Sequence, residues 1–441
     1  MIIVKFGGTS VSLNERISAI CQIVENQLKK DPIIVVSALS GVTDLLLSLP
    51  HLPKYKLTLE LKNLKKIHEE LIENVFSDEN LKKDVTDFIN GKIEEIAELK
   101  KSTEKSLLDK LSSFGEIMSS YIIAKALEQK GFKTVPVLAT NLIVTNDNFG
   151  SAEFIPDQTI KQIKKIINPL IKNRIVPVIT GFIGATKKGE VTTLGRGGSD
   201  YSASIIGFCL KALEIQIWTD VDGIFTTDPR LVKSARSLSV VSFREAAELA
   251  TFGAKVLHPR TIHPAVKAGI PVRVLNTFNP KGKGTLIINE TKGARKIKAI
   301  SFKRKITLVN IYSTEMLLQK GFLAKIFEIF ANNNISIDLV SVSEVSVSVT
   351  LDNTENLSVV VMELSKFTKV TVSENLGMVS LIGEGITDST KNIKNIFDVL
   401  GSNKILPKMV SLGATNINIS IVLESSQVEK AVTKLHSRVI E

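Results

Sequence analysis

The sequence is poor in cysteine and in aromatic residues, and it lacks long apolar stretches. Of its 441 residues, 2 are cysteines and 5% are aromatic. Cys21 and Cys209 both lie in apolar, helix-like contexts, so we expect buried reduced thiols rather than a disulfide scaffold. No apolar stretch approaches the roughly 18 residues of a membrane-spanning helix, so no membrane partner is expected. Lys5 and two glycines stand where a signal peptide would keep its apolar region, which predicts a cytoplasmic protein.

The positive charge of the chain is not concentrated in one place. The formal net charge is +11, but the lysines are spread through the sequence, and residues 62–110 mix Lys with Glu as a solvated helical face does. Neither an aromatic-rich basic groove nor an RNA-binding signature is present, so we expect no nucleic-acid partner. An enzyme with anionic substrates is compatible with this charge.

The length of the chain predicts two or three domains. Over residues 1–290 apolar runs alternate with helical patterns, which predicts an α/β fold: a mainly parallel open sheet with helices on both faces. Residues 55–129 interrupt this alternation as a Lys/Glu-rich helical excursion without strand signals. The expected strands are residues 2–4, 33–37, 134–138, 176–180, 215–218 and 272–275.

The carboxyl-terminal part contains an internal repeat. Turn residues cluster at 279–284, and after one short strand a basic stretch follows, so we place a domain boundary near residue 290. Residues 326–335 resemble residues 396–405, at an offset of 70, and the similarity continues beyond them. Each copy reads as strand, helix, strand, strand, which predicts two small α+β modules over residues 300–441 that pack together.

The two copies differ in their polar residues. Asp338, Ser343 and Glu344 in the first copy correspond to Lys408, Gly413 and Ala414 in the second. If the modules bind an amino acid, the first copy is therefore the one that holds it. The alternative is that these are ordinary exposed turn residues.

The first ten residues suit a phosphate. An apolar run delivers Lys5-Phe6-Gly7-Gly8 to the carboxyl end of the first strand, where open α/β sheets bind ligands. Glycines let backbone N–H groups approach an anion, and a lysine adds a point charge. Thr9 or Ser10 is predicted to cap a helix that starts near Ser12. A plain strand-to-helix turn explains the glycines equally well, and the chain contains no GxxxxGK[ST] loop.

A second glycine-rich segment runs from Thr192 to Asp200. Arg196 offers a planar fork that suits a carboxylate or phosphate. Ser199 and Asp200 are predicted to cap a helix over residues 201–213. Beside Lys5, the carboxylate of Asp200 could orient the ammonium group and keep it charged.

Other polar segments lie near expected strand ends. Residues 218–230 are rich in turn formers and are candidates for a nucleotide pocket, and residues 252–259 add another lysine. Glu116 either favours the positive end of an apolar helix that it begins or binds a substrate amine. His258 and His263 lack metal-type partners, so no protein metal site is expected.

Taken together, these segments resemble aspartokinases of the amino acid kinase family, and the paired modules look like ACT domains. The resemblance covers almost the whole chain and implies the amino acid kinase fold for residues 1–290. The strings that carry it are Lys5 to Ser10, Ser37 to Thr43, Gly115-Glu116, Thr193 to Asp200, Trp218 to Arg230 and Phe252 to Pro259.

The resemblance also implies roles for individual residues. Lys5 and Asp200 are implied as catalytic, with Asp200 organising the catalytic lysines. The residues implied to bind ATP are Lys5, Gly7, Gly8, Thr219, Asp220, Phe225, Arg230, Lys255 and Val256. Those implied to face aspartate are Thr43, Glu116, Arg196 and Ser199. The family often has Tyr at position 225, so the Phe here lacks a hydroxyl.

Within the family, the modules look most like the lysine-inhibited, single-function class. The residues implied for the effector are Met316, Phe322, Leu323, Asp338, Ser343 and Glu344. The implied reaction is ATP-dependent phosphorylation of L-aspartate to 4-phospho-L-aspartate with Mg²⁺, the first step towards lysine and diaminopimelate, threonine and methionine. A homodimer or homotetramer through the ACT modules is implied. The alternatives are a related kinase for another carboxylate or carbamate, and a non-catalytic amino-acid-sensing subunit.

Overall fold

The computed structural model describes residues 1–99, 106–253, 257, 259–291, 297–317, 319–413 and 415–440. The chain divides into two compact units, each described here by itself. The first unit comprises Met1–Ile224, Ser239–Phe243 and Val256–Glu290, and the second comprises Phe225–Leu238, Arg244–Lys255 and Thr291–Glu441. Two short segments before residue 290 thus group with the carboxyl-terminal part of the chain. No helix in the described ranges is long and apolar enough to cross a membrane.

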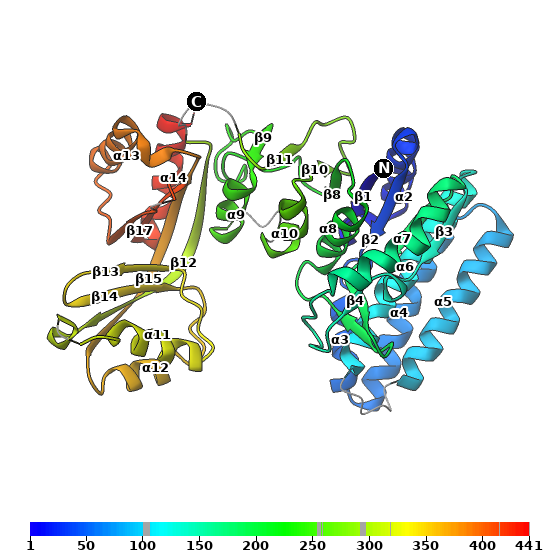
Figure 1. The fold of residues 1–441 in the computed structure, drawn as a ribbon, viewed down its shortest axis with the longest axis horizontal. Helices are drawn as coiled ribbons and strands as arrows, with labels where there is room; N and C mark the ends of the chain where they lie inside the picture. The colour runs from blue at the N-terminus through cyan, green and yellow to red at the C-terminus, as the bar shows by residue number, and fades with distance from the viewer. Residues whose placement is uncertain are drawn as a thin grey trace. The chain divides into compact units, whose positions relative to one another are not determined.

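The first unit is built on an eight-stranded sheet with the order β3-β5-β2-β1-β8-β10-β11-β9. Figure 1 labels most of these strands. Six neighbouring strands, from β3 to β10, run parallel, and β11 is antiparallel to β10. All six expected strands are present, and the fully buried β1, β2 and β5 show why, since strands buried on both faces read as near-continuous apolar segments. The bounds are β1 Ile2–Phe6, β2 Pro32–Val36, β3 Thr134–Val137, β5 Val176–Thr180, β8 Ile215–Thr219, β9 Val240–Ser242, β10 Val272–Asn276 and β11 Thr285–Ile288.

Helices cover both faces of this sheet, as predicted. Alternate residues of β1 divide between the faces: Ile2, Val4 and Phe6 join one core with α2 and the helical excursion, whereas Ile3 lies against α8 on the other. Helices α7, α8 and α10 pack beside one another on that second face. The bounds of the helices of this unit are α1 Gly8–Val11, α2 Asn14–Gln27, α3 Val42–Ser48, α7 Pro156–Lys172, α8 Gly198–Leu210 and α10 Pro259–Ala268. Helix α9, Phe243–Thr251, belongs to the second unit from Arg244 onward.

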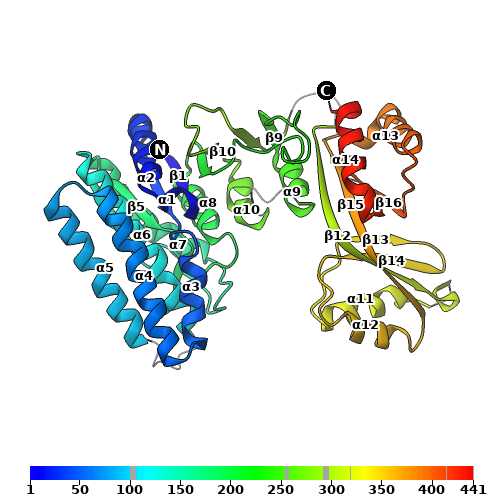
Figure 2. The same cartoon turned by 180° about the vertical axis from the view of Figure 1, so that it is seen from behind.

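The excursion consists of three helices, α4 Lys54–Val75, α5 Glu79–Leu99 and α6 Leu107–Gln129, drawn from blue to cyan in Figures 1 and 2. Helix α6 carries most of the buried side chains of the three and packs against the sheet. At Gly115 it approaches the end of β2 so closely that a Cβ would lie 2.6 Å from the Cβ of Ala38. The absence of a side chain at Gly115 thus lets α6 bring its next residue, Glu116, to the carboxyl end of the sheet.

A small second sheet was not predicted from the sequence. It comprises β4 Val144–Thr145, β6 Ile183–Thr186 and β7 Val191–Thr193, with β6 antiparallel to β7. These strands are two to four residues long and contain threonines and glycine, so they give no apolar run to detect. Strand β7 ends where the second glycine-rich segment begins.

Two predicted helix starts are wrong. Helix α1 begins at Gly8 rather than near Ser12, and α8 begins at Gly198 rather than at residue 201. The preceding residues are Gly7 and Gly197, and neither helix has a side-chain cap. Glycine has no side chain to cap a helix, so no side-chain oxygen of Gly7 or Gly197 occupies the backbone N–H groups of the first turn.

The second unit contains a six-stranded sheet with the order β13-β14-β12-β15-β17-β16 and antiparallel pairs throughout. Each repeat has the order strand, helix, strand, strand, helix, so the prediction lacked the second helix of each copy. The bounds are β12 Ala299–Tyr312, α11 Phe322–Asn332, β13 Leu339–Val342, β14 Ser346–Leu351, α12 Leu357–Leu364, β15 Lys369–Ile382, α13 Thr390–Ser402, β16 Met409–Leu412, β17 Asn418–Glu424 and α14 Ser425–Val439.

Two long strands join the modules. The first half of β12 contributes Ile300 to the core of the second module, and its second half contributes Val309 and Ile311 to the core of the first. Strand β15 runs the other way: Val370 in its first half packs against the core of the first module, and Val379 in its second half belongs to the core of the second. The two copies therefore share one sheet, consistent with the expectation that they pack together.

Candidate functional site

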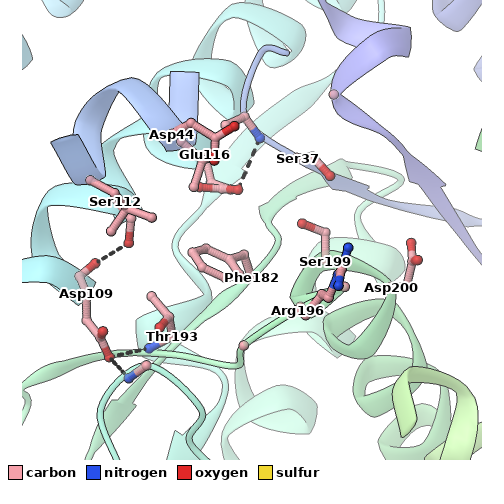
Figure 3. A pocket seen from close by; sticks show the side chains of 18 of the residues that line it. Ser37, Asp44, Asp109, Ser112, Glu116, Phe182, Thr193, Arg196, Ser199 and Asp200 are labelled. Atoms are coloured by element: carbon pink, nitrogen blue, oxygen red, sulfur yellow. Dashed lines mark hydrogen bonds between the residues drawn. The ribbon is translucent and has the colours of Figure 1, made fainter. Parts of the chain in front are cut away.

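The first unit contains a cavity of about 670 Å³ at the carboxyl ends of β1, β2 and β5 (Figure 3). Seven of its lining residues are ones that the sequence singled out for catalysis or ligand binding. They come from parts of the chain up to 195 residues apart and are Lys5, Gly8, Thr43, Glu116, Arg196, Ser199 and Asp200. This is the edge at which an open α/β sheet is expected to bind its ligand.

Lys5 projects from β1 toward the face that α8 covers. Because side chains alternate along a strand, Lys5 lies opposite the core residues Val4 and Phe6 and faces the start of α8. Its Nζ lies 2.6 Å from Oδ1 of Asp200, and only 11% of the lysine side chain is exposed. The carboxylate of Asp200 thus compensates for a nearly buried cation, which is the arrangement that the sequence predicted.

Gly7 and Gly8, which follow Phe6, differ in how closely their neighbours approach. A Cβ at Gly8 would lie 2.8 Å from the carbonyl oxygen of Ala38, and one at Gly7 would lie 3.7 Å from Nζ of Lys5. A side chain at position 8 would therefore collide with the backbone just after β2, so glycine is required there. At position 7 a Cβ would only reach van der Waals contact with the ammonium group of Lys5, so the glycine leaves that space to a ligand.

We call Lys5, Arg196, Ser199 and Asp200 the strand-end wall of the cavity. Arg196 follows Gly195 and precedes Gly197, whose φ angles of +77° and +69° favour glycine. The guanidinium is exposed and forms no ion pair with any residue in the described ranges. In Figure 3, Arg196, Ser199 and Asp200 lie together on one side of the view.

We call Asp44, Asp109, Ser112 and Glu116 the helical wall, because these residues come from α3 and α6. Glu116 is 3% exposed, its Oε1 accepts the N–H of Ala38 at 3.2 Å, and its Oε2 has no hydrogen-bond partner among the described residues. Burial raises the pKa of Glu116 to about 8, against the opposing effects of the Ala38 N–H and the charge of Lys5.

The position of Glu116 excludes one of its two interpretations. Helix α6 begins at Leu107, so Glu116 lies in the middle of the helix and not in its first turn. The prediction that it begins a helix is wrong, and with it the idea that it serves the positive helix end. A buried carboxyl group with a free oxygen at the cavity is suited to a ligand cation.

Sequence reasoning missed several lining residues. Asp44, Asp109 and Ser112 gave no pattern of their own, since each stands within an ordinary helical sequence. Phe182 lies on the turn between β5 and β6 with a φ of +68°, which is unusual for a residue other than glycine. Only the positive φ, which the sequence does not reveal, marks this position.

The predicted nucleotide residues fall into three groups. Thr219 ends β8 beside Gly7, whose N–H donates to the carbonyl of Trp218, and the Thr219 hydroxyl donates to Asp220 at 3.1 Å. Phe225 and Arg230 belong to the second unit. There the Arg230 guanidinium donates hydrogen bonds to the Asp228 carboxylate, the shortest at 2.7 Å. These hydrogen bonds hold the pKa of Asp228 below its usual value. Lys255 and Val256 lie outside the described residues.

The predicted effector residues differ in environment. Phe322 is buried in the core of the first module, where Met316 and Leu323 pack against it. Asp338 lies 3.3 Å from Nζ of Lys303, and its burial raises its pKa to about 6. Ser343 and Glu344 are exposed in the turn between β13 and β14.

The described ranges contain no group of three or more His, Cys, Asp or Glu residues that could hold a metal ion. The ionisable side chains of the cavity instead include two cations, Lys5 and Arg196, that suit phosphate and carboxylate ligands.

Comparison with known proteins shows the family of the chain. A model of the amino acid kinase family matches residues 1–276, and an ACT domain model matches residues 379–439. Over its full length the chain is 36% identical to the lysine-sensitive aspartokinase 3 of Escherichia coli K12, of which it covers 99%. The chain belongs to the aspartokinase family. It is also 36% identical over its full length to the chloroplastic aspartokinase 1 of Arabidopsis thaliana, of which it covers 80%.

Solved aspartokinase structures have the same fold. The E. coli aspartokinase III complex with aspartate and ADP is 35% identical, with a TM-score of 0.85 and full coverage of both chains. The complex of that enzyme with lysine and aspartate is 36% identical, with a TM-score of 0.86 and the same coverage. The predicted fold class, an amino acid kinase fold followed by ACT modules, is confirmed, and the chain is an aspartate kinase.

Proposed function

We propose that the enzyme transfers the γ-phosphoryl group of MgATP to the side-chain carboxylate of L-aspartate, giving ADP and 4-phospho-L-aspartate. The observation that carries this proposal is a pair of complementary groups at the cavity: the Glu116 carboxyl on the helical wall, whose Oε2 has no hydrogen-bond partner among the described residues, and the Arg196 guanidinium on the strand-end wall. An α-amino acid carries the complementary ammonium and carboxylate groups.

The substrate is oriented by these two walls. Oε2 of Glu116 accepts the α-ammonium group, since it is a buried acceptor without a hydrogen-bond partner among the described residues and, unlike Oδ1 of Asp200, is not paired with Lys5. Arg196 binds the α-carboxylate through its planar fork. Thr43 and Ser199 supply hydroxyls on the cavity surface. The side-chain carboxylate is then left to face Lys5.

The reaction needs little acid–base catalysis. An aspartate side chain with a pKa of about 3.9 is ionised at neutral pH, so the nucleophile needs no general base. The difficulty is the approach of an anionic oxygen to a polyanionic phosphate. Lys5 neutralises charge on the phosphoryl group during transfer, and Asp200 holds the Lys5 ammonium in position.

Mg²⁺ is expected to arrive with ATP. It keeps water and phosphate oxygens as ligands in many enzymes and so does not require a cage of carboxylates. The ion then neutralises phosphate charge in addition to Lys5. We assign the remaining nucleotide contacts to Gly7, Gly8, Thr219, Asp220, Phe225, Arg230, Lys255 and Val256, on the basis of the family resemblance.

We further propose that lysine inhibits the enzyme through the first ACT module. The E. coli relative is named lysine-sensitive, and one of its structures contains lysine. In this chain Asp338 already faces an ammonium group, that of Lys303. A lysine effector would use the same carboxylate together with the exposed Glu344 and favour a state of lower activity. Assembly through the ACT modules, the cytoplasmic location and the biosynthetic pathway remain predictions.

One assay tests the catalytic proposal. ADP release is measured with aspartate, glutamate and N-acetylglutamate as acceptors, each with and without lysine. We expect turnover with aspartate and its inhibition by lysine. Turnover only with another acceptor would favour the related-kinase alternative, and absence of turnover with all three would favour a non-catalytic sensor.

The effector proposal is tested by calorimetric titration with lysine. We expect Glu344→Ala to weaken lysine binding by about tenfold, the effect of losing one charge-assisted contact. Glu374→Ala, at an exposed position of β15, is the matched control and should bind lysine normally. No binding by the unmodified enzyme, or equal binding by both variants, would contradict the proposal.

A further inference from the structure

Asp109 joins three separate segments of the first unit. It lies in the first turn of α6 and is 4% exposed. Its Oδ2 accepts the N–H of Gly150 at 2.9 Å and the N–H of Thr193 at 2.8 Å, contacts that span 41 and 84 residues of sequence. Figure 3 shows the contact with Thr193 beside the cavity. One carboxylate oxygen therefore fixes two backbone segments to the helical wall.

These two segments also contact each other. The N–H of Ala152 donates to the carbonyl of Thr193 at 2.9 Å. A Cβ at Gly195 would lie 3.3 Å from the carbonyl oxygen of Gly150, so the backbones of the two segments are nearly in contact there. Arg196 is the next residue. The path from Asp109 to the guanidinium of Arg196 therefore passes through three residues of backbone, Thr193 to Gly195.

The cost of burying the Asp109 carboxylate must be offset by hydrogen bonds. A buried charge is unfavourable unless it accepts hydrogen bonds, and the Gly150 and Thr193 amides supply two. Removal of the carboxylate would in turn leave the buried amide of Thr193 without its acceptor. Both effects favour one fixed position of the segment that carries Arg196.

We propose that Asp109 is a positioning residue for the acceptor substrate. It holds residues 193–196 against α6 and so sets the distance between Arg196 on the strand-end wall and Glu116 on the helical wall. This inference rests on the proposed function, because it assigns Arg196 to the α-carboxylate of aspartate. Asp109 itself contacts neither the ATP phosphates nor the reacting carboxylate in this scheme.

The kinetic test compares three substitutions at this position. Asp109→Ala removes the acceptor, Asp109→Glu keeps the charge but displaces it by one methylene, and Asp109→Asn keeps an acceptor oxygen in place. We expect the Ala and Glu variants to raise KM for aspartate about tenfold or more, since small displacements of binding groups are costly. KM for ATP should stay within about twofold, and the Asn variant should keep most of the affinity.

The matched control is Asp84→Asn, a carboxylate on α5 that accepts a hydrogen bond from Tyr121 of α6 outside the cavity. It should leave both KM values unchanged. A general loss of folded enzyme would lower the apparent kcat without changing KM for aspartate. Unchanged KM for aspartate in both the Ala and Glu variants, or equal rises in both KM values, would overturn the proposal.

A second readout does not depend on turnover. Hydrogen–deuterium exchange should be faster in peptides covering 146–155 and 190–200 of the Asp109→Ala and Asp109→Glu variants than in the unmodified chain, with Asp84→Asn unchanged. Unaltered exchange in those peptides would contradict the positioning role even if aspartate proved not to be the substrate. Absence of aspartate turnover in the unmodified chain, with altered exchange in the variants, would instead reject the proposed function and keep the structural role of Asp109.

Discussion

The two walls of the cavity differ in how their charges are partnered. On the strand-end wall Lys5 and Asp200 form a nearly buried ion pair, and Arg196 stands beside it without an ionic partner among the described residues. On the helical wall Glu116 is buried with one oxygen unpartnered. The paired groups hold each other in position, whereas Oε2 of Glu116 and the Arg196 guanidinium are available to groups of a ligand. The comparison therefore assigns phosphoryl transfer to Lys5 and recognition of the acceptor to Glu116 and Arg196.

The largest effect on kcat is expected from a substitution of Lys5, which is paired with Asp200. Lys5→Ala should lower kcat by about two orders of magnitude or more, since electrostatic stabilisation of the transferring group is lost. The fold should survive, as judged by circular dichroism. Lys133→Ala, which removes an exposed lysine outside the cavity, is the control and should retain full activity. Near-normal turnover of folded Lys5→Ala would remove Lys5 from the mechanism.

A smaller effect, on a different kinetic constant, is expected for the unpaired cation. Arg196→Ala should raise KM for aspartate by about ten- to a hundredfold, the range for a lost charge-assisted hydrogen bond, with little change in KM for ATP. Arg174→Ala, at an exposed arginine outside the cavity, serves as the control in steady-state assays. If KM for ATP rose instead, Arg196 would belong with the nucleotide and the comparison of the walls would fail.

The unpaired carboxyl group predicts a pH dependence. With a pKa of about 8, Glu116 is mostly protonated at neutral pH in the free enzyme, and its ionised form is the better partner for an ammonium group. The kcat/KM for aspartate should therefore rise up to tenfold per pH unit below about pH 8 and level off above it. Glu116→Gln should have a lower kcat/KM at pH 8 and lack this rise. Identical pH profiles for both proteins would contradict the assignment.

The smallest expected effect is on stability. The unfolded carboxyl group has a pKa of about 4.3, so between that pH and about 8 the unfolded chain releases a proton that the folded chain keeps. Stability attributable to Glu116 thus falls as pH rises through this window. Glu116→Gln should raise the melting temperature by more at pH 8 than at pH 5, as measured by scanning calorimetry. A melting temperature difference independent of pH would contradict the raised pKa.

Most of the large sheet of the first unit could be predicted because its central strands are buried on both faces, whereas the three-residue β9 was missed. Residues 2–4 and 33–36 are uninterrupted apolar runs, and their ends marked the ligand edge. The sheet of β4, β6 and β7 could not be found, since its short strands contain threonine and glycine. The second helix of each repeat was missed at α12 and α14.

The sequence was sufficient to predict the main charged residues of the site but not the helix starts or the backbone contacts that position them. Lys5, Arg196 and Asp200 were found because glycines surround them or a strand precedes them. The starts of α1 and α8 were misjudged, since backbone conformation at Gly7 and Gly197 replaces the expected side-chain caps. Asp109 gave no signal, because its partners are backbone amides, which every residue except proline possesses.

The central claim is that Arg196 and Glu116 hold the amino acid end of aspartate so that its side-chain carboxylate meets Lys5. Acyl phosphates react with hydroxylamine, so the site of phosphorylation can be read from the hydroxamate formed when enzyme, MgATP, aspartate and hydroxylamine are incubated together. We predict that mass spectrometry against authentic standards will identify the 4-hydroxamate, in amounts that fall strongly with Lys5→Ala. Formation of the 1-hydroxamate, or of no hydroxamate by the unmodified enzyme, would contradict this orientation of the substrate.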